Sequence, residues 1–109
     1  MANYRRDVFL VAGGAIAHTF GPVTSPMYLK ELRVHVSAAP TTSENFTLTL
    51  RSVDGAEHDL VIYKIDLSAA STTDIFNTDF GMLLLTGDEL EVTYTNTDGR
   101  TIGVQLIFS

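Results

Sequence analysis

Residues 90–108 read LEVTYTNTDGRTIGVQLIF, with two runs of alternating residues on either side of an Asp-Gly pair. Apolar side chains occupy every second position over residues 90–94 and again over residues 102–108. Alternation with a period of two residues is typical of antiparallel strands that turn one face to the core and one to water. We therefore predict a strand on each side of Asp98-Gly99.

The length of the turn between these strands follows from the direction of their apolar side chains. A two-residue loop would put Thr95 opposite Ile102 and mix polar with apolar side chains on one face. A three-residue loop over residues 97–99 avoids this and places Gly99 in the left-handed conformation that such loops require. The pairs that it predicts are Tyr94 with Ile102, Val92 with Val104, and Leu90 with Leu106.

A second Asp-Gly pair, Asp54-Gly55, follows the alternating run FTLTLR at residues 46–51. A three-residue loop over residues 53–55 again brings the apolar faces of the flanking segments together. The pairs that it predicts are Leu48 with Leu60, Phe46 with Ile62, and Arg51 with Glu57, the last an exposed ion pair. Both Asp-Gly turns are therefore predicted as three-residue hairpins with a glycine bulge.

The rest of the chain predicts more short strands. These lie at residues 7–12, 15–20, 32–36, 59–65 and 73–76, while residues 82–86 are ambiguous and residues 37–44 and 68–74 are predicted loops. Seven or eight short strands with turns between them indicate an all-β fold, a single antiparallel β-sandwich with jelly-roll-like order. We expect one domain over residues 1–109, with residues 1–12 as an N-terminal arm or an edge strand.

Composition and charge limit the classes of partner. The 109 residues are 45% apolar, which is enough for the core of one domain, and cysteine is absent, so disulfides and thiolate metal sites are not expected. Residues 1–53 hold five cations and three carboxylates, whereas residues 54–109 hold two cations and ten carboxylates. Phosphate binding needs clustered cations, whereas this chain carries a net negative charge. No apolar run is long enough to cross a bilayer. We expect neither nucleic acid nor a membrane as a partner.

No constellation of catalytic residues stands out. The histidines His18, His35 and His58 lie in separate predicted strands. We expect His35 to point outward and His58 to point inward at a strand start. No zinc-protease motif, phosphate-binding loop or dinucleotide fingerprint is present. Asp54, Asp88 and Asp98 fall in turns, where carboxylates accept hydrogen bonds from local amides. We expect no catalytic, cofactor-binding or metal site, and no enzyme activity.

Two stretches resemble a known class of viral proteins. Residues 87–103, GDELEVTYTNTDGRTIG, and residues 45–52, NFTLTLRS, are similar to small β-sandwich structural proteins of tailed bacteriophages, of the head, decoration or tail-tip type. The resemblance covers about residues 28–109. It implies a virion structural protein, made in the host bacterial cytoplasm, that binds copies of itself and other virion proteins.

Carbohydrate binding, as a module used in host adsorption, is the alternative from a different class. Sandwich folds include lectins, and aromatic rings offer large amphipathic contact surfaces. The chain has no tryptophan. Three aromatic residues are predicted to point inward (Phe46, Tyr94 and Phe108), and three are candidates for the surface or the rim of the core (Tyr4, Tyr28 and Tyr63).

The N-terminal segment is the candidate surface for self-association. Residues 8–11, VFLV, form a continuous apolar run, which favours cover on both faces. The run follows Arg5-Arg6 and precedes Gly13-Gly14, so a basic arm held by the acidic body of a neighbouring copy is one interpretation. A buried first strand of the same sandwich is the other. The predicted interface residues are Arg5, Arg6, Val8, Phe9, Leu10 and Val11.

Overall fold

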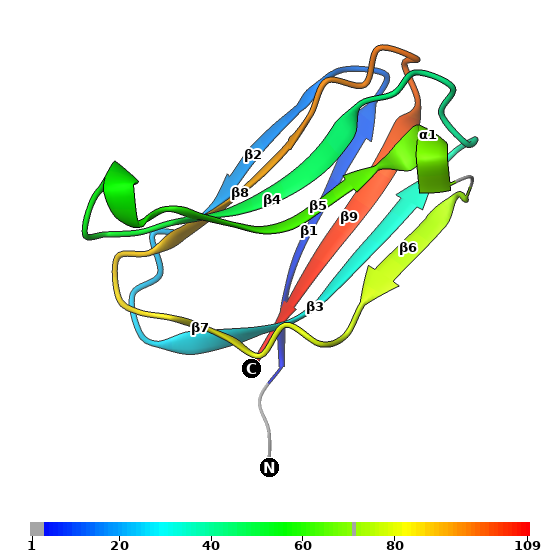
Figure 1. The fold of residues 1–109 in the computed structure, drawn as a ribbon. Helices are drawn as coiled ribbons and strands as arrows, with labels where there is room; N and C mark the ends of the chain where they lie inside the picture. Colours follow the sequence, from blue (N-terminus) through cyan, green and yellow to red (C-terminus); the bar gives the residue numbers. More distant parts are fainter. Residues whose placement is uncertain (1–3, 71) are drawn as a thin grey trace.

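Two antiparallel sheets make up the molecule (Figure 1). The computed structural model describes residues 4–70 and 72–109 and places nine strands in them. The strands are β1 (Arg5–Ala12), β2 (Ile16–Phe20), β3 (Met27–Val36), β4 (Asn45–Arg51), β5 (Leu60–Asp66), β6 (Asp74–Asn77), β7 (Met82–Leu84), β8 (Glu89–Tyr94) and β9 (Thr101–Phe108). A 3₁₀ turn, η1 (Ala56–His58), precedes β5, and a short helix, α1 (Leu67–Ala70), follows it. The predicted all-β sandwich is confirmed.

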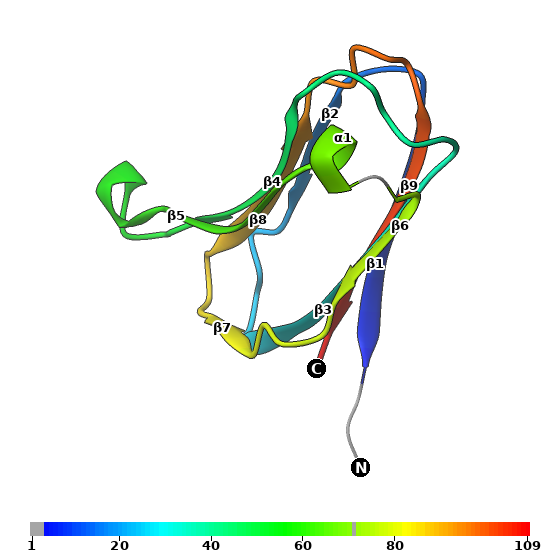
Figure 2. The ribbon, with the colours of Figure 1, turned by 45° about the vertical axis from the view of Figure 1, so that its right-hand side comes forward.

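The strand order is that of a jelly roll. One sheet has the order β1-β9-β3-β6, with β7 also pairing with β3, and the other has the order β2-β8-β4-β5. Most connections pass from one sheet to the other, so strands that follow each other in sequence usually face each other across the core. Figure 2 shows the two sheets as separate layers. A five-stranded and a four-stranded sheet interleaved in this way confirm the predicted jelly-roll order.

The turn at Asp98-Gly99 does not form the predicted hairpin. β8 pairs with β2 and β4, whereas β9 pairs with β1 and β3, so this turn joins the two sheets. The predicted pair of Tyr94 with Ile102 is wrong, because Tyr94 lies opposite Ile16. The pairs Val92 with Val104 and Leu90 with Leu106 are wrong for the same reason. Alternation indicates which side chains enter the core. A turn between the two sheets and a hairpin within one sheet both place these side chains in the core, so alternation does not distinguish them.

β4 and β5 form the second predicted hairpin, but its loop is longer than three residues. Residues 52–59 separate the strands and contain η1. A bulge in β5 then places Leu48 opposite Tyr63. The predicted pairs Leu48 with Leu60, Phe46 with Ile62 and Arg51 with Glu57 are therefore wrong. The carboxylate of Asp59 accepts a hydrogen bond from Ser52 N at 2.8 Å, which closes the longer loop.

The core lies between the sheets and takes alternate side chains from both. The predicted inward residues of β8 and β9 are all buried: Leu90, Val92, Tyr94, Ile102, Val104 and Leu106. The rings of Phe20 and Phe108, from opposite sheets, stack with their centroids 4.4 Å apart. Because the strands turn alternate residues to the core, the remaining residues form two outer faces, and a function must lie there or in the loops.

Carboxylates hold the connections, as expected of turn residues. Buried Asp88 accepts a hydrogen bond from Val53 N at 2.9 Å and so ties the loop of the β4–β5 hairpin to the start of β8. Asp66 accepts a hydrogen bond from Ser68 N at 3.0 Å, at the start of α1. This local cap explains why the predicted loop at residues 68–74 begins with helix.

Candidate interaction surface

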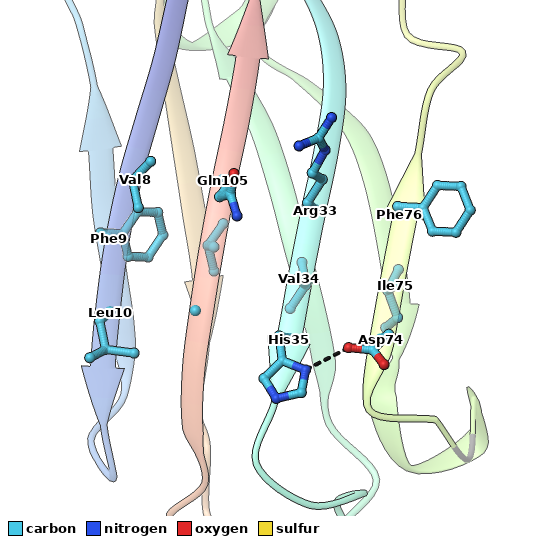
Figure 3. Close-up of a pocket in the computed structure, with 12 residues that line it drawn as sticks. Val8, Phe9, Leu10, Arg33, Val34, His35, Asp74, Ile75, Phe76 and Gln105 are labelled. Carbon is cyan, nitrogen blue, oxygen red and sulfur yellow. Dashed lines mark hydrogen bonds and ion pairs between the residues drawn. The ribbon is translucent and has the colours of Figure 1, made fainter.

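The outer face of the sheet that contains β1 is crossed by two rows of side chains. The strand register places them as Leu10–Gly103–His35–Asp74 and Val8–Gln105–Arg33–Phe76, each row running from β1 over β9 and β3 to β6. We call these eight residues the β1 face. Figure 3 shows them from the solvent side, drawn from strands that are far apart in the sequence.

Three large apolar side chains on the β1 face are open to solvent. The exposed fraction is 62% for Val8, 70% for Leu10 and 74% for Phe76. They border a groove of about 450 Å³, with the β1 residues on one side and Phe76 on the other (Figure 3). Gly103 lowers the floor of this groove, because it has no side chain between Leu10 and His35. Exposed apolar surface of this kind often marks a binding site.

The polar groups of the β1 face are paired at the surface. His35 Nδ1 lies 2.5 Å from Asp74 Oδ1, and both side chains are mostly exposed. Arg33 donates a hydrogen bond to Glu31 at 3.1 Å. Exposed ion pairs such as these contribute only about 0–1 kcal/mol to stability. They are better placed to contact a partner than to support the fold.

A second hollow, of about 440 Å³, continues the β1 face toward the start of β1. It is lined by Tyr4, Arg5, Arg6, Glu31, Arg33 and Ile107. Within residues 4–70 and 72–109, Arg5 and Arg6 form no ion pair, although Arg6 donates a hydrogen bond to Gln105 at 3.4 Å. Three guanidinium groups against one carboxylate attract negatively charged groups. We call this region the basic hollow.

The opposite sheet has a different outer face. Its outward residues form the rows Ala17–Thr93–Thr47–Lys64 and Thr19–Glu91–Thr49–Val61. Short hydroxyl side chains fill the centre of both rows beside Glu91, whose carboxylate accepts a hydrogen bond from Arg51 at 2.7 Å. We call these eight residues the threonine face. A face of this kind suits contact with water.

The predicted interface residues all lie on β1, the edge strand that pairs with β9. Arg6, Val8 and Leu10 lie on its outer side and are exposed, and Arg5 is exposed at the start of the strand. Phe9 and Val11 point inward and pack against the core, and Phe9 stacks on His18 with centroids 3.8 Å apart. The segment is therefore an edge strand of the sandwich, and its own core covers the inner half of the apolar run.

Sequence reasoning did not find the remaining residues of the β1 face. Phe76, Arg33 and Gln105 come from three strands whose order in the sheet is set by the topology. One signal was present in the sequence. Gly103 interrupts an alternating strand, and a glycine within a strand often marks a place where another group approaches the backbone closely.

The histidines lie apart from one another. His18 Nε2 is 2.7 Å from Asp7 Oδ2, and His35 is exposed beside Asp74, as its outward position predicts. His58 is exposed in η1, so the prediction that it points inward is wrong, because the longer loop replaces the expected strand start. Among the described residues, no group of three or more metal-binding side chains comes together.

Comparisons with known proteins add no relative. No model of a known protein family matches the chain, and a search of curated proteins finds no match. Of the helices in the part of the chain that the structure describes, none is long and apolar enough to cross a membrane.

Proposed function

We propose that this protein is a non-catalytic structural subunit that associates with further copies through the β1 face. The observation that carries the proposal is the exposure of Val8, Leu10 and Phe76 around one groove. Taking each of these side chains out of water contributes on the order of 1 kcal/mol. Several such contacts, repeated over many copies, hold a subunit in an assembly.

The position of β1 in the sheet supports the same conclusion. Among the described residues, β1 pairs with β9 alone, so the other edge of β1 has no strand beside it. Edge strands offer backbone donors and acceptors to further chains, and apolar side chains next to such an edge strengthen the association. An edge of this kind beside the exposed groove suits a surface that is covered in an assembly.

The proposed setting is the particle of a tailed bacteriophage. The resemblance of residues 45–52 and 87–103 to small structural proteins of such particles supports it, and jelly rolls serve as viral capsid domains. In this setting the protein is made in the host bacterial cytoplasm and binds copies of itself and other virion proteins. Several copies per purified particle, counted by quantitative mass spectrometry, are the expected result.

Sedimentation velocity over a range of concentrations tests the self-association. The wild-type chain should form oligomers, and the double variant Leu10→Asp/Phe76→Asp should shift to the monomer with an unchanged circular dichroism spectrum. The control variant Thr49→Asp/Thr93→Asp adds the same charge to the threonine face and should leave the oligomer intact. A wild-type chain that stays monomeric at every concentration would overturn the proposal.

The same groove supports a second candidate, a carbohydrate-binding module used in host adsorption. Phe76 presents an exposed ring, and Arg33, Gln105 and the His35–Asp74 pair supply polar groups around it. Small-ligand sites combine apolar walls with a few such polar groups. On a glycan array, sugar-specific binding that is lost in Gln105→Ala favours this candidate. An array without signal, together with concentration-dependent oligomers, favours the structural subunit.

A further inference from the structure

The loop of the β4–β5 hairpin projects from the sandwich on the side away from the β1 face (Figures 1 and 2). No residue of η1 is buried. In the described part of the chain, Asp54 and Glu57 form no ion pair. Val53 and Leu60 beside them have exposed fractions of 57% and 54%. We call these four residues the acidic tip.

The acidic tip and the β1 face are complementary in charge and in polarity. The tip presents two unpaired carboxylates next to apolar side chains. The basic hollow presents Arg5, Arg6 and Arg33 next to an apolar groove, with Glu31 as the carboxylate that lines it. Such opposite charges attract over about 8 Å at physiological ionic strength, and the apolar parts then supply contact area.

A single chain does not make this contact with itself, because its tip and its β1 face point in opposite directions (Figure 2). Two copies can make it. The contact joins two different surfaces, so each copy in a pair keeps one free tip or one free β1 face. Repetition of such a heterologous contact gives a ring or a filament.

We infer that the acidic tip of a second copy fills the β1 face. Its carboxylates Asp54 and Glu57 meet Arg5 and Arg6 in the basic hollow, and its apolar side chains enter the groove beside Leu10. The inference rests on the proposed self-association and adds the identity of the element that covers the groove. It also makes the assembly head-to-tail.

Two β1 faces packed against each other about a two-fold axis would match less well. Each copy would bring its own Arg5 and Arg6 to the interface, and within the described residues neither forms an ion pair. The nearby carboxylates, Glu31 and Asp74, are already paired with Arg33 and His35. Like charges brought together at an interface weaken it, whereas the acidic tip brings charges of the opposite sign.

Cross-linking between introduced cysteines tests which surfaces meet, because the natural chain has no cysteine. Ala56→Cys places a thiol in the tip without changing its charge, and Val8→Cys places one on the β1 face. A short bismaleimide is added to each variant alone and to a mixture in which one variant carries a mass tag. The control mixture pairs Ala56→Cys with Thr93→Cys on the threonine face.

We expect cross-linked dimers of mixed mass from Ala56→Cys with Val8→Cys, several-fold more than from either variant alone or from the control mixture. Val8→Cys dimers without mixed dimers would mean face-to-face packing, which overturns this inference and leaves the proposed self-association standing. Oligomers without either product would place the contact elsewhere and overturn it as well. A wild-type chain that sediments only as a monomer would remove the proposed function and this inference together.

Discussion

The outer face of β4 and β8 carries Thr47, Thr49 and Thr93 at its centre, whereas the outer face of β1 and β6 carries Val8 and Phe76. Both faces cover the same core, and both alternate with fully buried residues. Threonine fits an exposed strand at no cost, since its branched side chain favours the extended backbone and its hydroxyl binds water. Contact with water does not explain the exposed apolar residues of the β1 face in the same way.

The fold requires specific residues only on the inward side of each strand. The inward residues are fixed by the need to fill one core, so both sheets are alike there. The outward residues are not constrained by core packing, so their types reflect contact with water or with a partner. Exposed apolar side chains around a groove indicate a partner. The comparison therefore predicts that substitutions on the inner side of both sheets lower stability alike. Substitutions on their outer sides should differ in their effect on self-association.

The largest effects are expected beneath the two faces. Leu48 of β4 and Leu106 of β9 are fully buried, one under each face. Leu48→Ala and Leu106→Ala should each lower the free energy of unfolding by about 2–5 kcal/mol, measured by urea unfolding. Their outward neighbours Thr49→Ala and Gln105→Ala should change it by less than about 0.5 kcal/mol. Outward substitutions as costly as the inward ones would break the division between inner and outer positions.

A smaller but still large effect is expected at the turn that joins the two sheets. The amide of buried Asn96 donates hydrogen bonds to Gly14 O at 2.8 Å and Arg100 O at 2.9 Å, and accepts one from Arg100 N at 3.0 Å. Asn96 also has a φ of 57°, which asparagine tolerates better than alanine. Asn96→Ala should cost about 2–3 kcal/mol in urea unfolding, because partly buried backbone groups of Gly14 and Arg100 lose their partners.

Asn96→Gly is the matched control for this turn. Glycine adopts a positive φ without strain but supplies no amide, so it separates the two causes. Asn96→Gly should recover only the smaller, conformational part of the loss. Full recovery in Asn96→Gly would show that backbone strain, and not the hydrogen bonds, makes this residue important.

The sequence predicts the direction of side chains better than it predicts which strands pair. Alternation correctly assigns Leu90, Val92 and Val104 to the core. It does not distinguish a hairpin from a turn between sheets, because both place these residues inside. Deciding between them needs the long-range pairing of β9 with β1 and β3, and nothing near residues 95–100 specifies it.

The candidate site shows the same limit. The apolar run and the Arg5-Arg6 pair indicate β1 as an interaction surface from the sequence alone. Phe76 lies far away in the chain and joins Val8 only because β9 and β3 lie between their strands. A surface assembled across four strands depends on topology, so local patterns reveal one edge of it.

Acid should weaken the hydrogen bonds that join the β3–β4 loop to the turn between β8 and β9. The backbone N–H of Thr42, its hydroxyl and the same two groups of Thr41 donate hydrogen bonds to Asp98, and they lower its pKa from 3.8 to about 2. Because the folded pKa lies below the unfolded one, this stabilisation is present above pH 3.8 and is lost as the pH falls through about 2. Asp98→Asn should flatten the fall in melting temperature over this range.

Asp66 also contributes to the acid dependence of stability in the same experiment. Hydrogen bonds from the hydroxyls of Ser43 and Ser68 lower its pKa to about 2 as well, so a weaker acid dependence should remain in Asp98→Asn. Asp66→Asn should reduce that remainder. A wild-type acid profile in Asp98→Asn would mean that its bonds to Thr41 and Thr42 do not persist in solution.

The substitution Gly103→Thr should have the smallest effect on stability, and it separates the fold from the function of the β1 face. A Cβ atom at Gly103 would meet Leu10 Cδ1 at 4.0 Å, an ordinary contact, and the backbone has no positive φ there. Threonine favours the strand conformation more than glycine does, so the free energy of unfolding should stay the same or rise by up to about 1 kcal/mol. Gly99→Thr is the contrasting control. Its φ of 65° should make the same change cost about 1–2 kcal/mol.

The threonine at residue 103 nevertheless fills the floor of the groove, so sedimentation velocity should show weaker association in a chain that is as stable as the wild type. Wild-type association in Gly103→Thr would mean that the groove is not where a second copy docks.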